Sequence, residues 1–284
     1  MYTKVGFVLL FLLFTCQTGK LELVNDLPKS LKEVSGMETS VDGESLYMIN
    51  DSGNKPEIFV LDLKGKLKEI LDVDAKNIDW EELTTDKEGH LYIGDFGNNM
   101  NDRDNLAIYK VHPEKKTKKG ELEVEKIWFK FPDQKEFPPK RKHRFFDCES
   151  FIYLNNHFYL FTKSRAPKKH GLTTLYKVPA TPGHHIAEKI DSFETCEALA
   201  CWITAADISE DGKTIALLTA DSVWLFENFE GDNFFSGDHK QILLEHESQK
   251  ESLCFIDERT IYIADEQNKT QGRNLYKFQV MKYP

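Results

Sequence analysis

The 284-residue chain has few cysteines and none of the compact motifs that identify the commonest enzyme sites. It has five Cys, and none of them shows the Cys-x-x-Cys or Cys/His spacing of a structural zinc site. It also lacks a Gly-rich phosphate-binding loop, the G-x-S-x-G elbow of serine hydrolases and the H-E-x-x-H motif of zinc proteases. Nucleotide, serine-nucleophile and zinc chemistry are therefore not indicated.

Positive charge and helical periodicity are also scarce. The 37 Lys and Arg stand against 47 Asp and Glu, so the net charge of −10 argues against nucleic-acid binding. Hydrophobic residues make up 40% and charged residues 30% of the chain, which is typical of a folded protein rather than a disordered one. No long segment has a helical period, and 20 Phe favour β-structure.

The one strongly apolar run, over residues 5–14, is about half the roughly 20 residues of a membrane span. It follows a charged start and is typical of an export signal. The string LFTC that ends at Cys16 resembles a bacterial lipobox, so we predict residues 1–15 as a signal peptide and Cys16 as the lipidated end of the mature chain. The bulky Phe14 leaves cleavage by an ordinary signal peptidase as an alternative, and a retained anchoring helix is a weaker one. The lipid would anchor the protein at the periplasmic or outer-membrane face.

The other cysteines are interpreted in that exported setting, which permits disulfides. Cys196 and Cys201 either close a small disulfide loop or remain a pair of buried thiols. Cys148 and Cys254 fall in strand-like segments, so we expect them in the core.

A hairpin unit recurs along the chain, and each unit has two short strands around a polar turn and a polar ending. The copies are EVSGMETSVDGESLYMINDSGN (33–54), NIDWEELTTDKEGHLYIGDFGNN (77–99), FDCESFIYLNNHFYLFTKSR (146–165), ITAADISEDGKTIALLTADS (203–222) and QKESLCFIDERTIYIADEQN (249–268). A third strand follows every copy, and a fourth follows the first four, at LKEILDV, EVEKIWFKF, HIAEKIDSF and KQILLEH. A repeated four-stranded unit predicts a β-propeller.

We therefore predict an all-β fold, a five-bladed β-propeller that forms a single domain over residues 20–284. The last unit lacks a fourth strand, and the segment at 20–28 is expected to supply it, so that the two ends of the domain close the ring together. A six-bladed ring is the alternative, if a degenerate blade lies between the second and third units.

Acidic residues recur where the units begin. Strands one and two of a unit are antiparallel, so the start of the first and the end of the second lie at the same mouth of the ring. Glu81, Glu149 and Glu251 share one aligned column, and Asp207 stands next to that column in the fourth unit. Because Ca²⁺ takes hard oxygen ligands, we predict Glu81, Glu149, Asp207 and Glu251 as a metal site. The alternative is that these acids accept hydrogen bonds from backbone N–H groups near the strand starts.

The ends of the second strands supply a second set of polar residues at the same mouth, although Asx-Gly endings are also ordinary turn chemistry. Lys163 and Arg165 are the cationic pair expected to hold an anionic group of a ligand. The full predicted ligand-binding set is Asp51, Asn54, Asp95, Asn98, Lys163, Arg165, Asp265 and Asn268.

Together, DWEELTTDKEGHLYIGDFGNN, FDCESFIYL, ITAADISEDGKTIALLT and QKESLCFIDERTIYIADE resemble a family of exported bacterial propellers, many of them lipoproteins of Bacteroidetes-like bacteria. This family is related loosely to NHL-repeat, SdiA-regulated and esterase-like phytase propellers. The resemblance covers about residues 30–280 and implies a propeller with a polar central mouth, without implying a reaction. More distant calcium-dependent lactonases, phytases and arabinanases keep catalytic acids and Ca²⁺ at an equivalent mouth, but their catalytic His or Lys has no sure match here.

The sequence thus predicts an exported, membrane-anchored monomer that binds a small anionic or metal-bridged ligand, or a protein partner, at an acidic mouth. The alternative is a calcium-dependent hydrolase of lactones, phosphoesters or glycans, with carboxylates and a metal as its tools.

Overall fold

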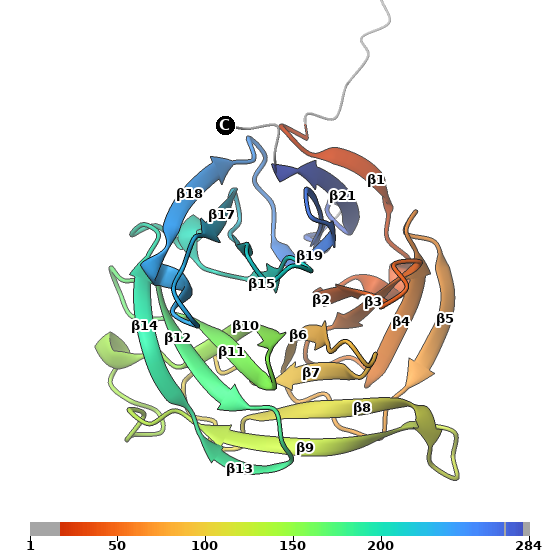
Figure 1. The fold of residues 1–284 in the computed structure, drawn as a ribbon, viewed down its shortest axis with the longest axis horizontal. Coiled ribbons are helices and arrows are strands. Elements are labelled where there is room, and N and C mark those ends of the chain that lie inside the picture. Colours follow the sequence, from red (N-terminus) through yellow and green to blue (C-terminus); the bar gives the residue numbers. More distant parts are fainter. Residues whose placement is uncertain (1–17, 270, 281–284) are drawn as a thin grey trace, which may run out of the picture.

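The computed structural model describes residues 18–269 and 271–280 (Figure 1). The predicted signal peptide and Cys16 lie outside the described residues. In the part of the chain that is described, no helix combines the length and apolarity needed to cross a membrane.

The described chain forms five β-sheets arranged as blades around a central axis (Figure 1). This confirms the five-bladed propeller, and the stretch between the second and third blades contains only the short 3-10 helix η2 (Arg141–His143) rather than a sixth blade. The other 3-10 helices are η1 (Lys29–Leu31), η3 (Leu199–Cys201) and η4 (Phe234–Ser236). The strands of the blades, each from the axis outwards, are β2 (Val34–Thr39), β3 (Ser45–Asn50), β4 (Glu57–Asp62) and β5 (Leu67–Asp72); β6 (Trp80–Thr85), β7 (Leu91–Asp95), β8 (Ala107–Lys116) and β9 (Leu122–Lys130); β10 (Asp147–Leu154), β11 (His157–Lys163), β12 (Leu172–Pro179) and β14 (Glu188–Glu194); β15 (Ala205–Ile208), β16 (Ile215–Leu218), β17 (Ser222–Glu227) and β18 (Asp238–Leu243); and β19 (Lys250–Asp257), β20 (Thr260–Asp265), β21 (Asn274–Gln279) and β1 (Glu22–Asp26).

The ring closes as predicted, because β1 is the fourth strand of the last blade. It pairs antiparallel with β21, and Leu23 lies opposite Tyr276. The backbone N–H of Leu27 donates to the carbonyl of Arg273 at 2.8 Å just beyond this pairing. The first described strand therefore joins the last described one, and every blade has at least four strands.

One predicted fourth strand is divided between two blades. Within the predicted HIAEKIDSF segment, only β14 serves the third blade, whereas β13 (Gly183–Ile186) crosses over and pairs parallel to β9 of the second blade. The ring of His184 stacks on that of Trp128 at a centroid distance of 6.1 Å. Because β9 is long and lies at the outer edge, β13 covers backbone groups that would otherwise be open to edge-to-edge pairing.

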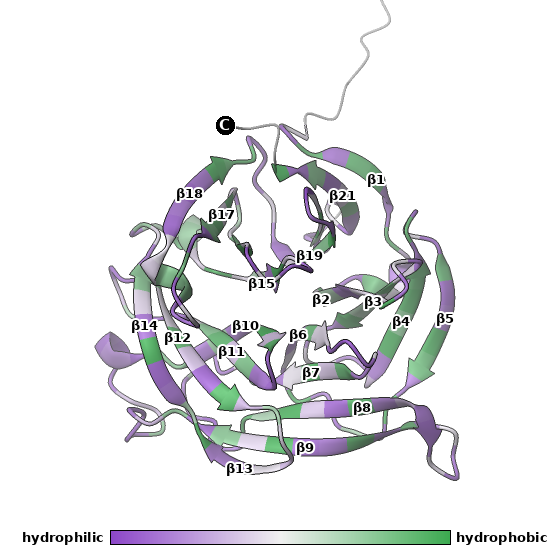
Figure 2. Ribbon diagram, in the orientation of Figure 1, coloured by the Kyte–Doolittle hydropathy of each residue, from purple (hydrophilic) through white to green (hydrophobic). Residues whose placement is uncertain are grey.

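The hydrophobic core lies between neighbouring blades. In one cluster, Trp80, Ile93 and Tyr109 of the second blade pack with Ile49 and Ile58 of the first. Figure 2 shows apolar residues along the middle strands, where both sheet faces are covered, and hydrophilic residues in the outer strands and loops. Each blade thus buries its faces against its neighbours, which is why the same four-stranded unit is repeated around the ring.

The cysteines follow the sequence expectations. Cys196 and Cys201 form a disulfide, which decides between the two alternatives left open for this pair. Cys148 and Cys254 are free and fully buried in the core, as predicted.

Ring closure can be tested with two leucines, one within β1 and one directly after it. Leu27 is 1% exposed in a cluster with Leu31 and Leu275, whereas Leu23 is 46% exposed. We expect Leu27→Ala to lower the free energy of unfolding by about 2–5 kcal/mol, because it leaves a cavity at the closure. Leu23→Ala should change it by less than about 0.5 kcal/mol. Urea denaturation measures both, and equal losses would contradict the role given to this closure.

Candidate functional site

A β-bulge at the start of the innermost strand positions the predicted acidic column. The pairing of strands one and two skips one residue in four blades, and the skipped residue leaves the regular ladder. The skipped residues are Ser35, Glu81, Glu149 and Glu251, which are the aligned column of the sequence. The repeat therefore placed these three glutamates correctly in equivalent positions.

Glu81 lies in a compact acidic group at this mouth. Ligand oxygens of Asp51, Asp79 and Glu81 all lie within 4.8 Å of one another. Glu81 is buried, and the two aspartates are half-buried in the loops that follow β3 and precede β6. Three carboxylates at this spacing can surround one cation whose bonds to oxygen are about 2.3–2.6 Å, as for Ca²⁺.

The local backbone is built around this acidic triad, as we name Asp51, Asp79 and Glu81. A Cβ atom at Gly97 would overlap the carboxylates of both Glu81 and Asp79, so only glycine leaves them room. Asn77 ties two loops of the triad together, because its Nδ2 donates to the carbonyl of Asp51 at 2.9 Å while its Oδ1 accepts from the N–H of Trp80.

Glu149 lies at the same mouth but already has cationic partners. Its carboxylate contacts Lys163 Nζ at 3.0 Å and Arg165 Nη2 at 2.9 Å, and Arg165 Nε also donates to Asp147. The predicted cationic pair is therefore at the mouth, where it neutralises acids of its own blade. Trp202 covers the pair, with its ring centroid 4.7 Å from the guanidinium carbon of Arg165.

The disulfide contributes to this cover. Trp202 directly follows Cys201, and its Nε1 donates to the carbonyl of Ser164 at 2.6 Å. The carbonyl of Cys201 also accepts a hydrogen bond from Thr195 at 2.8 Å. The cross-linked loop therefore holds Trp202 over Lys163 and Arg165.

Burial, followed by repulsion from neighbouring carboxylates, raises the pKa values of several acids at the mouth. Burial, and then the charge of Asp51, raises the pKa of Asp79 to about 6. Burial, followed by Glu149 and Asp51, raises the pKa of Glu81 well above its ordinary value. The pKa of Glu251 is raised mainly by burial. Burial and then the charge of Glu251 raise the pKa of Glu266 to about 8. Protons or a bound cation relieve this repulsion.

Asp207 does not join the other predicted metal ligands, and its predicted place at the mouth is wrong. It lines a cavity at the opposite end of the ring, beside the hairpin turns. The turn residues Ser209 and Asp86 make the same backbone hydrogen bonds, which makes Asp207 equivalent to Thr84 rather than to Glu81. The fourth blade has no bulge, so counting from its first apolar residue shifted the alignment.

The predicted ligand-binding residues divide into two groups. Asp51, Lys163 and Arg165 line the mouth, whereas several others serve as internal supports. The carboxylates of Asp95 and Asp265 accept hydrogen bonds from the tyrosines of the third strands of their blades, both at 3.1 Å.

The three predicted asparagines either make hydrogen bonds within the fold or lie apart from the triad. Asn98 binds Asp147 through its backbone N–H at 2.7 Å and so joins the second blade to the third. Asn54 donates to Glu33 at 2.6 Å, and Asn268 is exposed in a turn with Gln271.

Sequence reasoning missed four residues of the mouth: Asp79, Asp147, Trp202 and Glu266. A usable signal existed for the first two, because Asp79-Trp80-Glu81 and Asp147-Cys148-Glu149 repeat the same Asp-x-Glu pattern in two blades. The other two stand in loops after strands, where the repeat has no fixed length.

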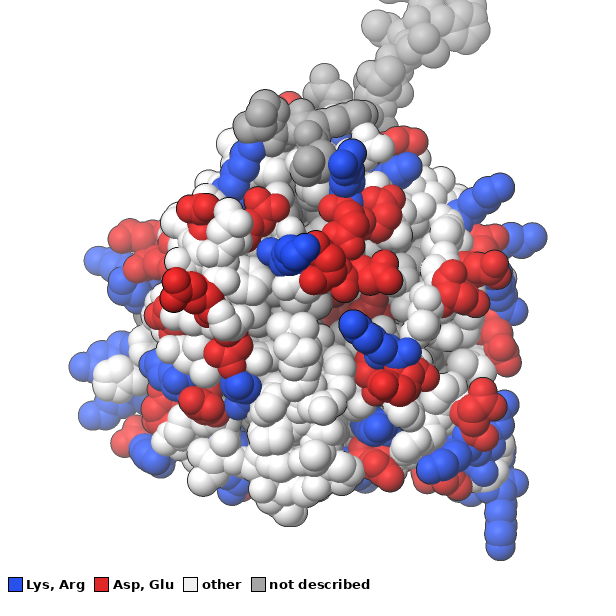
Figure 3. Space-filling model, viewed as in Figure 1, with Lys and Arg blue, Asp and Glu red and all other residues white. Residues whose placement is uncertain are grey.

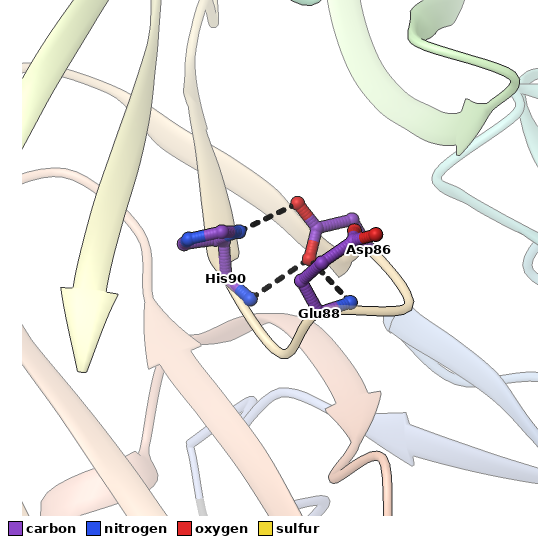
Figure 4. Close-up of side chains that lie close together, drawn as sticks. All are labelled: Asp86, Glu88 and His90. Atoms are coloured by element: carbon purple, nitrogen blue, oxygen red, sulfur yellow. Dashed lines mark hydrogen bonds and ion pairs between the residues drawn. The ribbon is translucent and has the colours of Figure 1, made fainter. Parts of the chain in front are cut away.

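A second acidic group, Asp86, Glu88 and His90, lies in the turn between β6 and β7 (Figure 4). Both carboxylate oxygens of Asp86 are occupied: one accepts the backbone N–H groups of Glu88 and His90, and the other accepts Tyr92 Oη at 2.7 Å and contacts His90 Nδ1 at 2.8 Å. Despite partial burial, these hydrogen bonds lower the pKa of Asp86. This group is therefore explained as turn chemistry.

The acidic triad predicts an unusual stability change. Above a folded-state pKa of about 6, the ionised Asp79 destabilises the native state, because its ordinary pKa is 3.8. We expect Asp79→Asn to raise the free energy of unfolding near pH 8 in the presence of a chelator. The native state binds the extra proton between about pH 4 and 6, so the gain should shrink as the pH falls through 6 and vanish below about 4. Urea denaturation across this range is the measurement, and a loss of stability near pH 8 would contradict the electrostatic account.

No protein-family model and no curated protein matches the chain in sequence. Solved structures match in fold. A gluconolactonase of Xanthomonas campestris is similar over 93% of this chain and 91% of that one, with 10% identity and a TM-score of 0.50. A PQQ-bound aldose sugar dehydrogenase of Streptomyces coelicolor is similar over 92% and 98%, with 9% identity and a TM-score of 0.52. A hydrazine synthase of Kuenenia stuttgartiensis matches at a TM-score of 0.41 and 14% identity over 84% of this chain, which spans 57% of that chain. At these identities, the likeness shows the propeller fold alone.

Proposed function

We propose that the protein is a binding propeller whose ligand is held at the acidic mouth through a divalent cation. The single observation that carries the proposal is the spacing of the acidic triad, whose ligand oxygens lie within 4.8 Å of one another. Oxygen ligands on converging loops suit Ca²⁺ better than a transition metal, and the triad contains neither His nor Cys.

The balance of charge explains why a cation is needed. An anionic ligand alone would meet Asp51, Asp79 and Glu81 without a counter-charge, since Lys163 and Arg165 are already paired with Asp147 and Glu149. A cation in the triad attracts the anionic group, and the Arg165 guanidinium beneath Trp202 lies at the same mouth to orient it. The proposed ligand class is therefore a small anionic or metal-bridged molecule.

The cellular part of the proposal rests on the amino-terminal sequence. The lipobox-like string before Cys16 supports export and a lipid anchor at the periplasmic or outer-membrane face. The mouth would then sample ligands outside the cytoplasm.

Calcium titration tests the site directly. After chelator treatment, calorimetry should detect one Ca²⁺ bound by the wild type, and Asp79→Asn or Glu81→Gln should weaken the affinity at least about tenfold, because each removes a charged ligand. Glu88→Gln is the matched control, since Glu88 belongs to the acidic group of the β6–β7 turn. Absence of binding by the wild type, or an equal loss in the control, would refute the proposed cation site.

A cation-dependent hydrolase is the second candidate. The acidic triad favours it, because a cation held by Asp51, Asp79 and Glu81 could activate a bound water or polarise a substrate. The fold likeness to a gluconolactonase makes sugar lactones the first substrates to try.

A panel of lactones, phosphoesters and aryl glycosides should be assayed with and without EDTA. Turnover that EDTA removes and Glu81→Gln lowers at least about a hundredfold would establish the hydrolase. Calcium binding without turnover would support the binding protein.

A further inference from the structure

The face opposite the mouth contains an acidic cavity. It has a volume of about 920 Å³ and lies among the turns that join the first two strands of the blades. Figure 3 shows acidic side chains gathered around the hollow at the centre of this face. The ionisable residues that line it are one lysine, Lys87, and the acids Glu38, Asp86, Glu88, Asp207, Glu210, Asp211 and Asp257.

Two carboxyl groups form the floor of this cavity. Glu38 is 8% exposed and Asp207 is 6% exposed, and they come from the innermost strands β2 and β15. Asp207 accepts the N–H groups of Phe255 and Ile208, both at 2.7 Å, and Glu38 accepts the N–H of Thr39 at 2.7 Å. Within the described part of the chain, no lysine, arginine or histidine forms an ion pair with either carboxylate.

Glu82 adds a third carboxyl group that is 0% exposed. Its Oε1 accepts the N–H groups of Met37 and Leu83, at 3.2 and 3.0 Å, and Met37 is the neighbour of Glu38. Its Oε2 is buried and has no hydrogen-bond partner among the described residues. A buried carboxylate oxygen without a partner is costly, so it adds uncompensated negative charge near Glu38 and Asp207, although Glu82 itself does not line the cavity.

The three acids act on one another across the axis. Burial raises the pKa of Glu38 to about 7, and burial followed by the charge of Glu38 raises that of Asp207. The pKa of Glu82 is raised first by burial and then by Asp207 and Glu38. At the mouth, Lys163 and Arg165 form ion pairs with neighbouring acids. The floor acids of this cavity have no such ion pair with a lysine or arginine among the described residues.

The spacing of the floor distinguishes an organic cation from a metal ion. Among the described residues, Glu38, Glu82 and Asp207 do not form a group whose ligand oxygens all lie within 4.8 Å of one another, as those of the acidic triad do. A Ca²⁺ ion would need that spacing, because its bonds to oxygen are about 2.3–2.6 Å. An ammonium group makes contacts of about 2.7–2.9 Å and so bridges carboxylates that stand farther apart.

The walls and rim indicate the rest of the ligand. Tyr153, Phe229 and Phe255 give the cavity aromatic surface between the floor and the rim. Asp257 stands in the turn of the fifth blade and gives the rim negative charge, whereas Asp211 in the turn of the fourth blade is already paired with Lys213 Nζ at 3.1 Å. The methylene groups of a ligand can pack against these aromatic walls, and a second positive charge on the ligand can pair with the acids of the rim.

We propose that this cavity binds a linear organic amine with at least two ammonium groups, one held by Glu38 and Asp207 at the floor and another by the rim acids. The site is separate from the cation site at the mouth, so either site can exist without the other. The buried position of the floor acids makes them the main source of affinity, since charge pairs are strongest where water is excluded.

Calorimetry with spermidine at about 0.15 M salt, where surface attraction is screened, tests the proposal. We expect one saturable site in the wild type, and Asp207→Asn and Glu38→Gln should each weaken the affinity at least about tenfold. Glu69→Gln on the outer strand β5 and Glu81→Gln at the mouth are matched controls, because neither residue lines this cavity, and each should change the affinity less than about threefold. Spermidine should also raise the melting temperature of the wild type but not of Asp207→Asn.

Several results would overturn this proposal. They are the absence of saturable binding, equal losses in the floor variants and the control variants, or retained spermidine affinity in both floor variants. Calcium binding that is lost in Asp207→Asn, without spermidine binding, would assign the cavity to a metal instead. Urea denaturation shows whether each variant is folded before it is titrated.

Discussion

The structure depends on a single electrostatic constraint: the innermost strands of five blades bring carboxyl groups together at an axis that contains few cations. Burial removes water from Glu81, Glu82 and Asp207, and their mutual repulsion adds to that penalty. The fold remains favourable because apolar surface between the blades offsets this cost. Where negative charges are concentrated in this way, binding a proton or another positive group relieves their repulsion.

The two ends of the axis meet this constraint differently. At the mouth, Arg165 and Lys163 neutralise Asp147 and Glu149 within one blade, and the disulfide loop brings Trp202 over them. At the turn face, Glu38 and Asp207 rely on hydrogen bonds from backbone and hydroxyl groups. The first end has paired acids and cations, and the second has a mainly acidic surface with aromatic walls.

The sequence allowed the ring to be predicted well, because the spacing of strands and turns is repeated and reports the fold directly. The equivalence of Glu81, Glu149 and Glu251 followed from the same repeat, since a bulge at one position recurs in their blades. Asp79 and Asp147 could have been found from the repeated Asp-x-Glu pattern, whereas Trp202 and Glu266 could not be predicted, because they stand in loops of irregular length. Asp207 was misplaced for a related reason: its blade lacks the bulge, and side-chain direction changes with every residue along a strand.

The pairing of β1 with β21 has a consequence for the order in which the chain folds. Residues 22–26 must wait for residues 274–279, so the ring cannot close before residues 274–279 have left the ribosome. Until then the last blade keeps an open edge at β21's position in the ring. A topology in which β1 waits for β21 therefore makes completion of the last blade a late step of assembly.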